Sequence, residues 1–246
     1  MKRTLSAFLL ILTLASSGPA AAMPPSLLVW ADSGMRQAIQ VPLKAAKDGT
    51  FFLDKFEYAT SDYRIRLSDV LLDPDPSISY VLAVADFGAP SAFSISFLTP
   101  IVPTGAPNEV NAWIGGGLLD LTGNGIALTP THSALQVSML GTPLPATNMG
   151  VDVGQAFAAG PRDRSSLYAY GLYSSGLIPG PGPGPWTGLG ASIAFQFSGG
   201  GDMAALAGHV GIQETIVPVP APSSAALVGL GLLGGLAGWL RRRRTA

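Results

Sequence analysis

The stretch Ala92-Phe-Ser-Ile-Ser-Phe97 decides the fold of this chain. Its large side chains, at positions 93, 95 and 97, fall on one face of an extended backbone, and its small side chains fall on the other. In a helix, the large and the small side chains would both be distributed around the helix axis. The period of two residues therefore predicts a β-strand that is buried on one face.

The same alternation recurs on both sides of this stretch, and turn-forming segments rich in Gly, Pro, Asp and Asn separate the alternating ones. These turns are expected at residues 73–76, 86–90, 122–125 and 198–202. The expected inward-facing side chains are Ile78, Tyr80, Leu82 and Val84; Val110, Ala112 and Ile114; Leu135, Val137 and Met139; Ile193, Phe195 and Phe197; and Leu206, Gly208, Val210 and Ile212.

Many short strands with regular turns predict an all-β fold, an antiparallel β-sandwich or jelly-roll-like single domain over residues 23–217. Residues 32–47 are the nearest candidate for a short helix, although Pro42 interrupts them.

Charge and cysteine content exclude several classes of protein. Only 12% of the residues are charged, and the body between the two ends holds eight basic and 15 acidic residues, a net charge of about −7. No Lys or Arg occurs between Arg66 and Arg162. An anionic body argues against nucleic-acid partners. The absence of cysteine removes disulfides, thiolate catalysis and thiolate metal ligands.

The first 22 residues have the layout of a secretory signal peptide. Lys2 and Arg3 form a basic start, residues 5–14 are almost entirely apolar, and the small residues Ala20 and Ala22 fit the positions before a signal-peptidase cut. Cleavage after Ala22 predicts an exported protein that begins at Met23.

Residues 218–246 form a three-part tail. A proline-rich segment is followed by the uncharged residues 223–240 and then by four consecutive arginines. As a helix, residues 223–240 extend about 27 Å, which is just enough to cross the hydrocarbon core of a membrane. Glycines weaken the insertion of this span, and the basic end predicts a cytoplasmic C-terminus with residues 23–217 outside.

This tail resembles the PEP-CTERM sorting signal of exported Gram-negative proteins. Ala221 stands where the family motif has Glu. The resemblance implies an exosortase-type membrane enzyme as processing partner, transient membrane anchoring, and delivery to the cell surface or the exopolysaccharide matrix. A plain membrane anchor is the alternative. The residues that carry the resemblance are Val219, Pro220, Pro222, Arg241, Arg242, Arg243 and Arg244.

Catalytic chemistry has few candidates in this sequence. His132 and His209 are the two possible imidazole bases, and no Gly-x-Ser-x-Gly motif accompanies them. His209 has the opposite parity to Val210 and Ile212, which predicts a surface or edge position. Two distant histidines without cysteine do not predict a zinc site. We therefore expect no catalytic, cofactor-binding or metal-binding residues and no enzymatic activity.

Two acidic turns offer oxygen atoms of the kind that calcium prefers, one at Asp73 and Asp75 and the other at residues 120–125. The same side chains also stabilise turns by bonding to their own backbone, and we favour this second role.

The expected function is that of a structural or adhesive protein of the cell surface or extracellular matrix, associated with exopolysaccharide. One alternative is a carbohydrate-binding module that uses exposed rings at Trp113, Tyr168, Tyr170 or Trp186. A polysaccharide-acting enzyme built on carboxylates is the other alternative.

Overall fold

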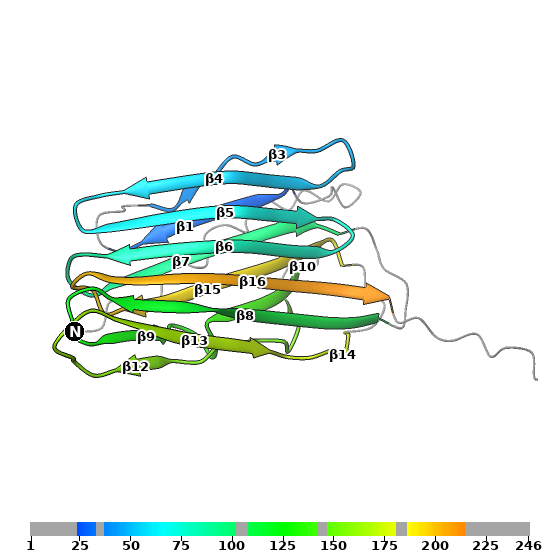
Figure 1. Cartoon of the computed structure of the whole chain (residues 1–246). Coiled ribbons are helices and arrows are strands. Elements are labelled where there is room, and N and C mark those ends of the chain that lie inside the picture. Colours follow the sequence, from blue (N-terminus) through cyan, green and yellow to red (C-terminus); the bar gives the residue numbers. More distant parts are fainter. Residues whose placement is uncertain (1–23, 33–36, 102–107, 142–146, 181–185, 215–246) are drawn as a thin grey trace, which may run out of the picture. The chain divides into compact units, whose positions relative to one another are not determined.

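The structure is a computed structural model and describes residues 24–32, 37–101, 108–141, 147–180 and 186–214. These residues form sixteen β-strands in two sheets and contain no helix (Figure 1). Each strand pair is antiparallel, which confirms the all-β prediction.

Sheet 1 contains eight of the described strands. In spatial order these are β11 (Thr147–Asn148), β10 (Gln136–Gly141), β15 (Gly188–Phe197), β7 (Ser91–Pro100), β1 (Ser26–Ala31) and β2 (Ile39–Gln40), with β9 (Ile126–Pro130) also beside β15 and β12 (Phe157–Ala159) beside β9. The strand β15 is central, because β7 pairs with one of its edges and β10 and β9 pair with the other.

Sheet 2 contains the other eight described strands. In spatial order these are β13 (Ser166–Ser174), β8 (Asn108–Asp120), β16 (Asp202–Glu214), β6 (Ser77–Asp86), β5 (Tyr63–Asp73), β4 (Phe51–Ala59) and β3 (Lys44–Ala45), with β14 (Ile178–Pro179) also beside β8. The strand β16 is central here, because it pairs with β8 on one side and β6 on the other (Figure 1).

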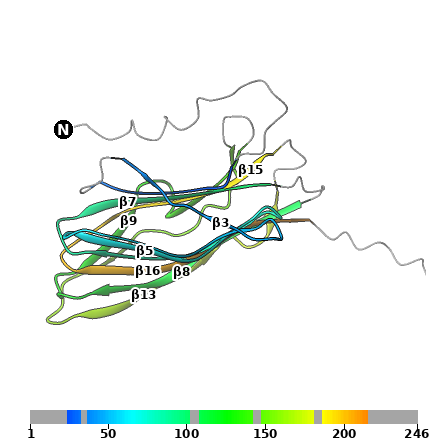
Figure 2. The ribbon, with the colours of Figure 1, turned by 90° about the horizontal axis from the view of Figure 1, so that it is seen from above.

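The two sheets face each other as two layers across one hydrophobic core (Figure 2). On β7, the side chains of Phe93, Ile95 and Phe97 are buried between the layers, as their alternation predicts. From sheet 2, the ring of Tyr80 stacks on that of Phe97 with centroids 4.9 Å apart. The fold is therefore an antiparallel two-sheet β-sandwich.

Two local predictions are wrong. The described part of residues 32–47 contains β2 and β3 rather than a helix. On β10, the predicted inward positions Val137 and Met139 face outward, whereas Gln136 and Ser138 are fully buried. The amide of Gln136 tolerates burial because it is hydrogen-bonded inside the core, to the Tyr80 hydroxyl among others.

The expected signal peptide, residues 1–22, and the expected sorting tail, residues 218–246, lie outside the described residues. Within the described part of the chain, no helix is long and apolar enough to cross a membrane.

Candidate functional site

The outer face of sheet 2, which points away from the core, carries most of the exposed large apolar side chains of the described residues. Five of the eight lie on this face, and the other three lie in loops. A concentration of exposed apolar side chains marks a surface that contacts another molecule. The five are Leu71, Val81, Trp113, Leu167 and Leu172.

Trp113 and His209 form a ring pair on this face. Trp113 of β8 lies directly opposite His209 of β16 in the strand register. Their ring centroids are 6.2 Å apart, and the ring planes are inclined by only 21°. Trp113 points outward because Ala112 and Ile114 on either side of it point into the core. The two rings thus form a nearly parallel platform, and 37% of the Trp113 residue surface is accessible.

Electrostatics keep this platform uncharged near neutral pH. Burial lowers the pKa of His209 below its usual value, so the imidazole is neutral at pH 7. A neutral imidazole beside an indole presents an apolar surface with hydrogen-bonding ring edges.

Polar groups that can hydrogen-bond surround the ring pair. Ser79 of β6 lies opposite His209, and Asn111 of β8 lies opposite Gly211 of β16. A Cβ atom at Gly211 would lie 2.9 Å from His209 Nε2 and 3.4 Å from Asn111 Oδ1, so glycine leaves the space into which these two side chains converge. The Oδ1 atom of Asn111 is shielded and has no hydrogen-bond partner among the described residues.

A floor of small residues extends from the ring pair toward the end of sheet 2 at which β6 and β8 finish and β16 begins. Because these side chains are short, the backbone of three adjacent strands lies close to the surface. The floor residues are Gly117 of β8, Ala205 and Ala207 of β16, and Ala83 of β6, of which Gly117, Ala205 and Ala83 are in register with one another.

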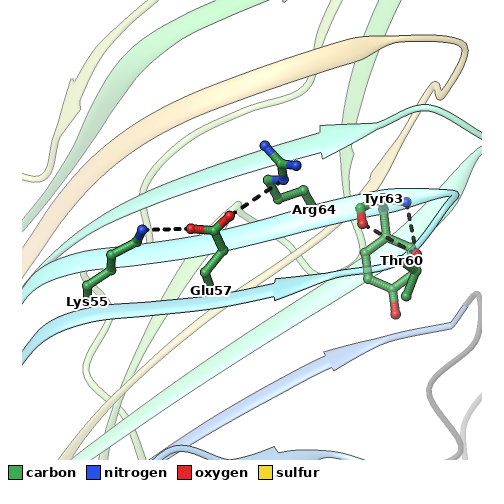
Figure 3. A network of polar contacts seen from close by, with 5 residues as sticks. All are labelled: Lys55, Glu57, Thr60, Tyr63 and Arg64. Carbon is green, nitrogen blue, oxygen red and sulfur yellow. Dashed lines mark hydrogen bonds and ion pairs between the residues drawn. The ribbon is translucent and has the colours of Figure 1, made fainter.

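A charged border lies on β4 and β5 (Figure 3), and β5 pairs with β6, the strand that carries Ala83 of the floor. The Glu57 carboxylate is 2.8 Å from Lys55 Nζ and 3.7 Å from Arg64 Nε. The hydrogen bond and charge of Lys55 lower the pKa of Glu57. In the adjoining turn, the Thr60 hydroxyl accepts a hydrogen bond of 3.1 Å from the Tyr63 N–H. The exposed ion pairs stabilise the fold little, but they set a polar limit to the apolar surface.

The other aromatic candidates lie elsewhere. Tyr170 is only 2% exposed, and its hydroxyl donates a hydrogen bond of 2.7 Å to the carbonyl of Gln155. Tyr168 and Trp186 are partly buried and pack against the core. Tyr168 and Tyr170 do lie on the same face of β13, as their spacing predicts, but this face points toward the core. Only Trp113 of the four belongs to the outer face of sheet 2.

The two acidic turns use their carboxylates to hold the backbone. Asp73 Oδ1 accepts a hydrogen bond of 2.9 Å from the Asp75 N–H. Asp120 accepts three, from the N–H groups of Thr122, Gly123 and Gly125 at 3.1, 2.6 and 2.9 Å. Both arrangements match the turn-stabilising role. Among the described residues, no group of three His, Asp or Glu side chains is placed to hold a metal ion.

The remaining candidates are not brought together. His132 lies in the loop between β9 and β10 of sheet 1, whereas His209 lies on sheet 2. An open hollow of about 850 Å³ is lined by the consecutive residues 162–167, so it joins no distant parts of the sequence. Ala20, Ala22 and the sorting residues Val219, Pro220, Pro222 and Arg241 to Arg244 lie outside the described residues.

Sequence reasoning singled out Trp113 but missed the ring pair. It predicts a surface or edge position for His209, and the structure does place this residue on the outer face. The signal that would have linked the two is that both residues interrupt inward-facing apolar alternation with an outward ring. The pairing itself depends on β16 lying beside β8.

Comparisons with known proteins assign no family to this chain. No protein-family model matches the chain, and no curated protein matches it. Among solved structures, the family 11 carbohydrate-binding module of the cellulosomal cellulase Lic26A-Cel5E of Clostridium thermocellum is similar at 9% identity, over 71% of this chain and 97% of that one, with a TM-score of 0.22. At this TM-score the similarity assigns neither a ligand nor an activity to the chain.

Proposed function

We propose that this chain is an exported structural or adhesive protein of the cell surface or extracellular matrix, and that it holds matrix polysaccharide on the outer face of sheet 2. The observation that carries the adhesive role is the exposed, nearly parallel ring pair of Trp113 and His209.

Sugar rings have apolar faces and polar edges. The faces pack on aromatic side chains, and the hydroxyls exchange hydrogen bonds with amides and hydroxyls. The ring pair supplies the first kind of contact, and Asn111, Ser79 and the ring nitrogens supply the second. The floor of small residues lets an extended chain lie close to the backbone between the exposed side chains of Val81 and Leu172.

Charge selects the class of polysaccharide. No Lys or Arg occurs between residues 66 and 162, so β6 and β8 bring no cation to the ring pair. Glu109 on β8 and Asp73 on β5 add negative charge to the same face. The cations of this face, Lys55, Arg64 and Arg66, lie on β4 and β5, away from the ring pair. Because the strands around the ring pair carry acidic groups and no cation, they repel anionic polymers, and the expected ligand is a neutral polysaccharide.

Export and sorting are proposed from the two ends of the sequence. The basic and apolar start up to Ala22 directs the chain outward, and the proline-rich, apolar and arginine-rich tail presents it to an exosortase-type enzyme. This route would deliver the sandwich to the place where extracellular polysaccharide is found.

Affinity electrophoresis tests the adhesive role. The wild-type chain should be retarded in gels that contain neutral polysaccharides extracted from the producing cells, and Trp113→Ala should migrate as in a gel without polysaccharide. Phe87→Ala is the matched control, since it removes another exposed aromatic ring, 46% accessible, from a loop away from the ring pair. Equal retardation of wild type and Trp113→Ala would rule out this surface.

A further inference from the structure

Three buried aspartates lie side by side at one end of sheet 2. Asp202, the first residue of β16, is in register with Asp86, the last residue of β6, and with Asp120, the last residue of β8. All three are fully buried. Residues that lie directly opposite each other on neighbouring antiparallel strands have Cα atoms about 4.5–5.5 Å apart. The three acidic groups therefore occupy adjacent positions inside the protein.

Each aspartate stands where the chain crosses between the sheets. The chain leaves sheet 2 after Asp86 and Asp120 to begin β7 and β9, and it enters sheet 2 at Asp202 after β15. The three connecting loops, residues 87–90, 121–125 and 198–201, therefore meet at this end, which is on the left in Figure 1.

Backbone hydrogen bonds tie these loops to one another. The Gly200 N–H donates to the Gly88 carbonyl at 2.9 Å, and the Gly201 N–H donates to the Asp86 carbonyl at 2.8 Å. The Thr122 hydroxyl lies 3.0 Å from the Gly200 carbonyl, to which it can donate. Through these hydrogen bonds, a displacement of one loop would also displace the other two.

The three carboxylates are not equally well stabilised. Asp120 accepts three backbone N–H groups, and Asp86 accepts the Ser91 N–H at 3.1 Å. Asp202 accepts only the Ser198 hydroxyl, on Oδ2, and its Oδ1 has no hydrogen-bond partner among the described residues. A buried carboxylate with one donor is the least favourable of the three in its ionised form.

No cation compensates these charges within the described residues, where the ion pairs all lie on β3, β4 and β5. The acidic side chains of Asp32 and Asp62, near Asp86 and Tyr63, add further negative potential. Arg162 and Arg164 flank the 121–125 loop, but their backbone carbonyls face Gly123, and the Arg162 guanidinium lies over the Tyr168 ring.

Burial, together with the charges of Asp120 and Asp86, raises the pKa of Asp202 to about 6. Burial also raises the pKa of Asp86. Because the folded-state pKa of Asp202 lies above its value in an unfolded chain, about 3.9, the folded state binds the proton more tightly. Its stabilising effect is complete below about pH 4 and is lost as the pH rises through about 6.

We propose that a proton held by Asp202 locks the three loops together at this end of the sandwich, and that ionisation of Asp202 loosens them. An ionised Asp202 repels the carboxylates of Asp86 and Asp120, each of which is hydrogen-bonded to its own loop. This end of the domain is then held most tightly at mildly acidic pH. The ring pair of Trp113 and His209 lies on the opposite face of the sheet and further along its strands.

Hydrogen exchange of the purified full-length chain in mild detergent tests the lock. After correction for intrinsic exchange, amides of residues 198–202 and 121–125 should be about tenfold better protected at about pH 5 than at about pH 7.5. The change in melting temperature between the two pH values should favour the lower pH by about 3 to 6 °C more in the wild type than in Asp202→Asn. The protection difference in these loops should disappear in Asp202→Asn, because the neutral amide cannot ionise, whereas the opposing effect of His209 is common to both proteins and cancels in the comparison.

Asp75→Asn is the matched control and should keep the wild-type profile, since Asp75 lies in a different turn at the other end of β6. Ser198→Ala removes the hydroxyl that stabilises the ionised Asp202 and should move the loosening to higher pH, which gives a second test should Asp202→Asn fold poorly. Unchanged pH dependence in Asp202→Asn would overturn the proposal. So would a gain in melting temperature with CaCl₂ at about pH 7.5 that Asp202→Asn lacks, because a cation would then neutralise the aspartates.

Discussion

Tyr80 of β6 and Gln136 of β10 connect the two sheets through a hydrogen bond of 2.6 Å between the Tyr80 hydroxyl and Gln136 Oε1, inside the core. The Gln136 amide then donates from Nε2 to the backbone carbonyl of His209 at 3.0 Å. A single polar chain thus runs from sheet 2 into sheet 1 and back to β16, beneath the ring pair.

Removing one partner of this bond should destabilise the domain. Tyr80→Phe leaves Gln136 Oε1 buried without a donor, and we expect it to lower the free energy of unfolding by about 1–3 kcal/mol. Gln136→Leu should have a similar cost. The double variant should cost less than the sum, because each single variant already removes the bond between Tyr80 and Gln136. Urea denaturation measures all three values. Strictly additive costs would show that the bond contributes little.

Gly208→Ala should be destabilising, because a Cβ at this position would collide with the Tyr80 hydroxyl and lie 2.7 Å from Gln136 Oε1. Overpacking of this kind costs about 1–3 kcal/mol. Gly160→Ala is the control, since its Cβ would meet nothing within 4 Å. Thermal unfolding of both variants should show a lower melting temperature only for Gly208→Ala. A wild-type melting temperature in that variant would mean that Tyr80 moves aside without cost.

His209 should make the domain less stable in acid. Its folded-state pKa is lowered by burial, so as the pH falls below about 6.5 the unfolded chain takes up a proton that the folded chain resists. His209→Gln should therefore gain stability relative to wild type as the pH is lowered from about 7.5 to about 5. This effect is opposite in sign to that of Asp202. Urea titrations at both pH values separate the two, and a difference independent of pH would contradict the prediction.

Processing at both ends should be visible by mass spectrometry of surface protein from the native cells. The mature chain should begin at Met23 or a close neighbour and end near residues 220–224. Replacing Arg241 to Arg244 by Ser should alter release from the membrane. A surface form that keeps Lys2 and Arg3 would contradict export by signal peptidase, and one that keeps the arginines would identify the tail as a plain anchor.

The strands could be predicted from the sequence wherever one face is uniformly apolar. At residues 92–97 and 193–197 large side chains alternate with small or polar ones, and the structure buries the large ones. The pattern misled at residues 135–139, because Gln136 and Ser138 are polar yet face inward. The partner that makes the burial of Gln136 tolerable is Tyr80, on another strand of the opposite sheet, and alternation along one strand contains no information about it.

The candidate site was predictable only in part, for a related reason. Outward parity placed Trp113 and His209 on a surface, but their stacking depends on which strands become neighbours. Likewise the three aspartates, which the sequence spreads over more than a hundred positions, become one cluster only through the β6, β16 and β8 register. Parity alone also could not decide that Tyr168 and Tyr170 face the interior.

The last two strands of the described domain, β15 and β16, fill the central positions of the two sheets. Until these two strands are available, nothing connects the strands on one side of each sheet to the strands on its other side. Neither sheet can therefore be completed by the residues that are synthesised first. For a chain exported as proposed, both sheets can therefore be completed only after Glu214 has passed through the translocation channel, whereas consecutive hairpins such as β4–β5 and β5–β6 can form earlier.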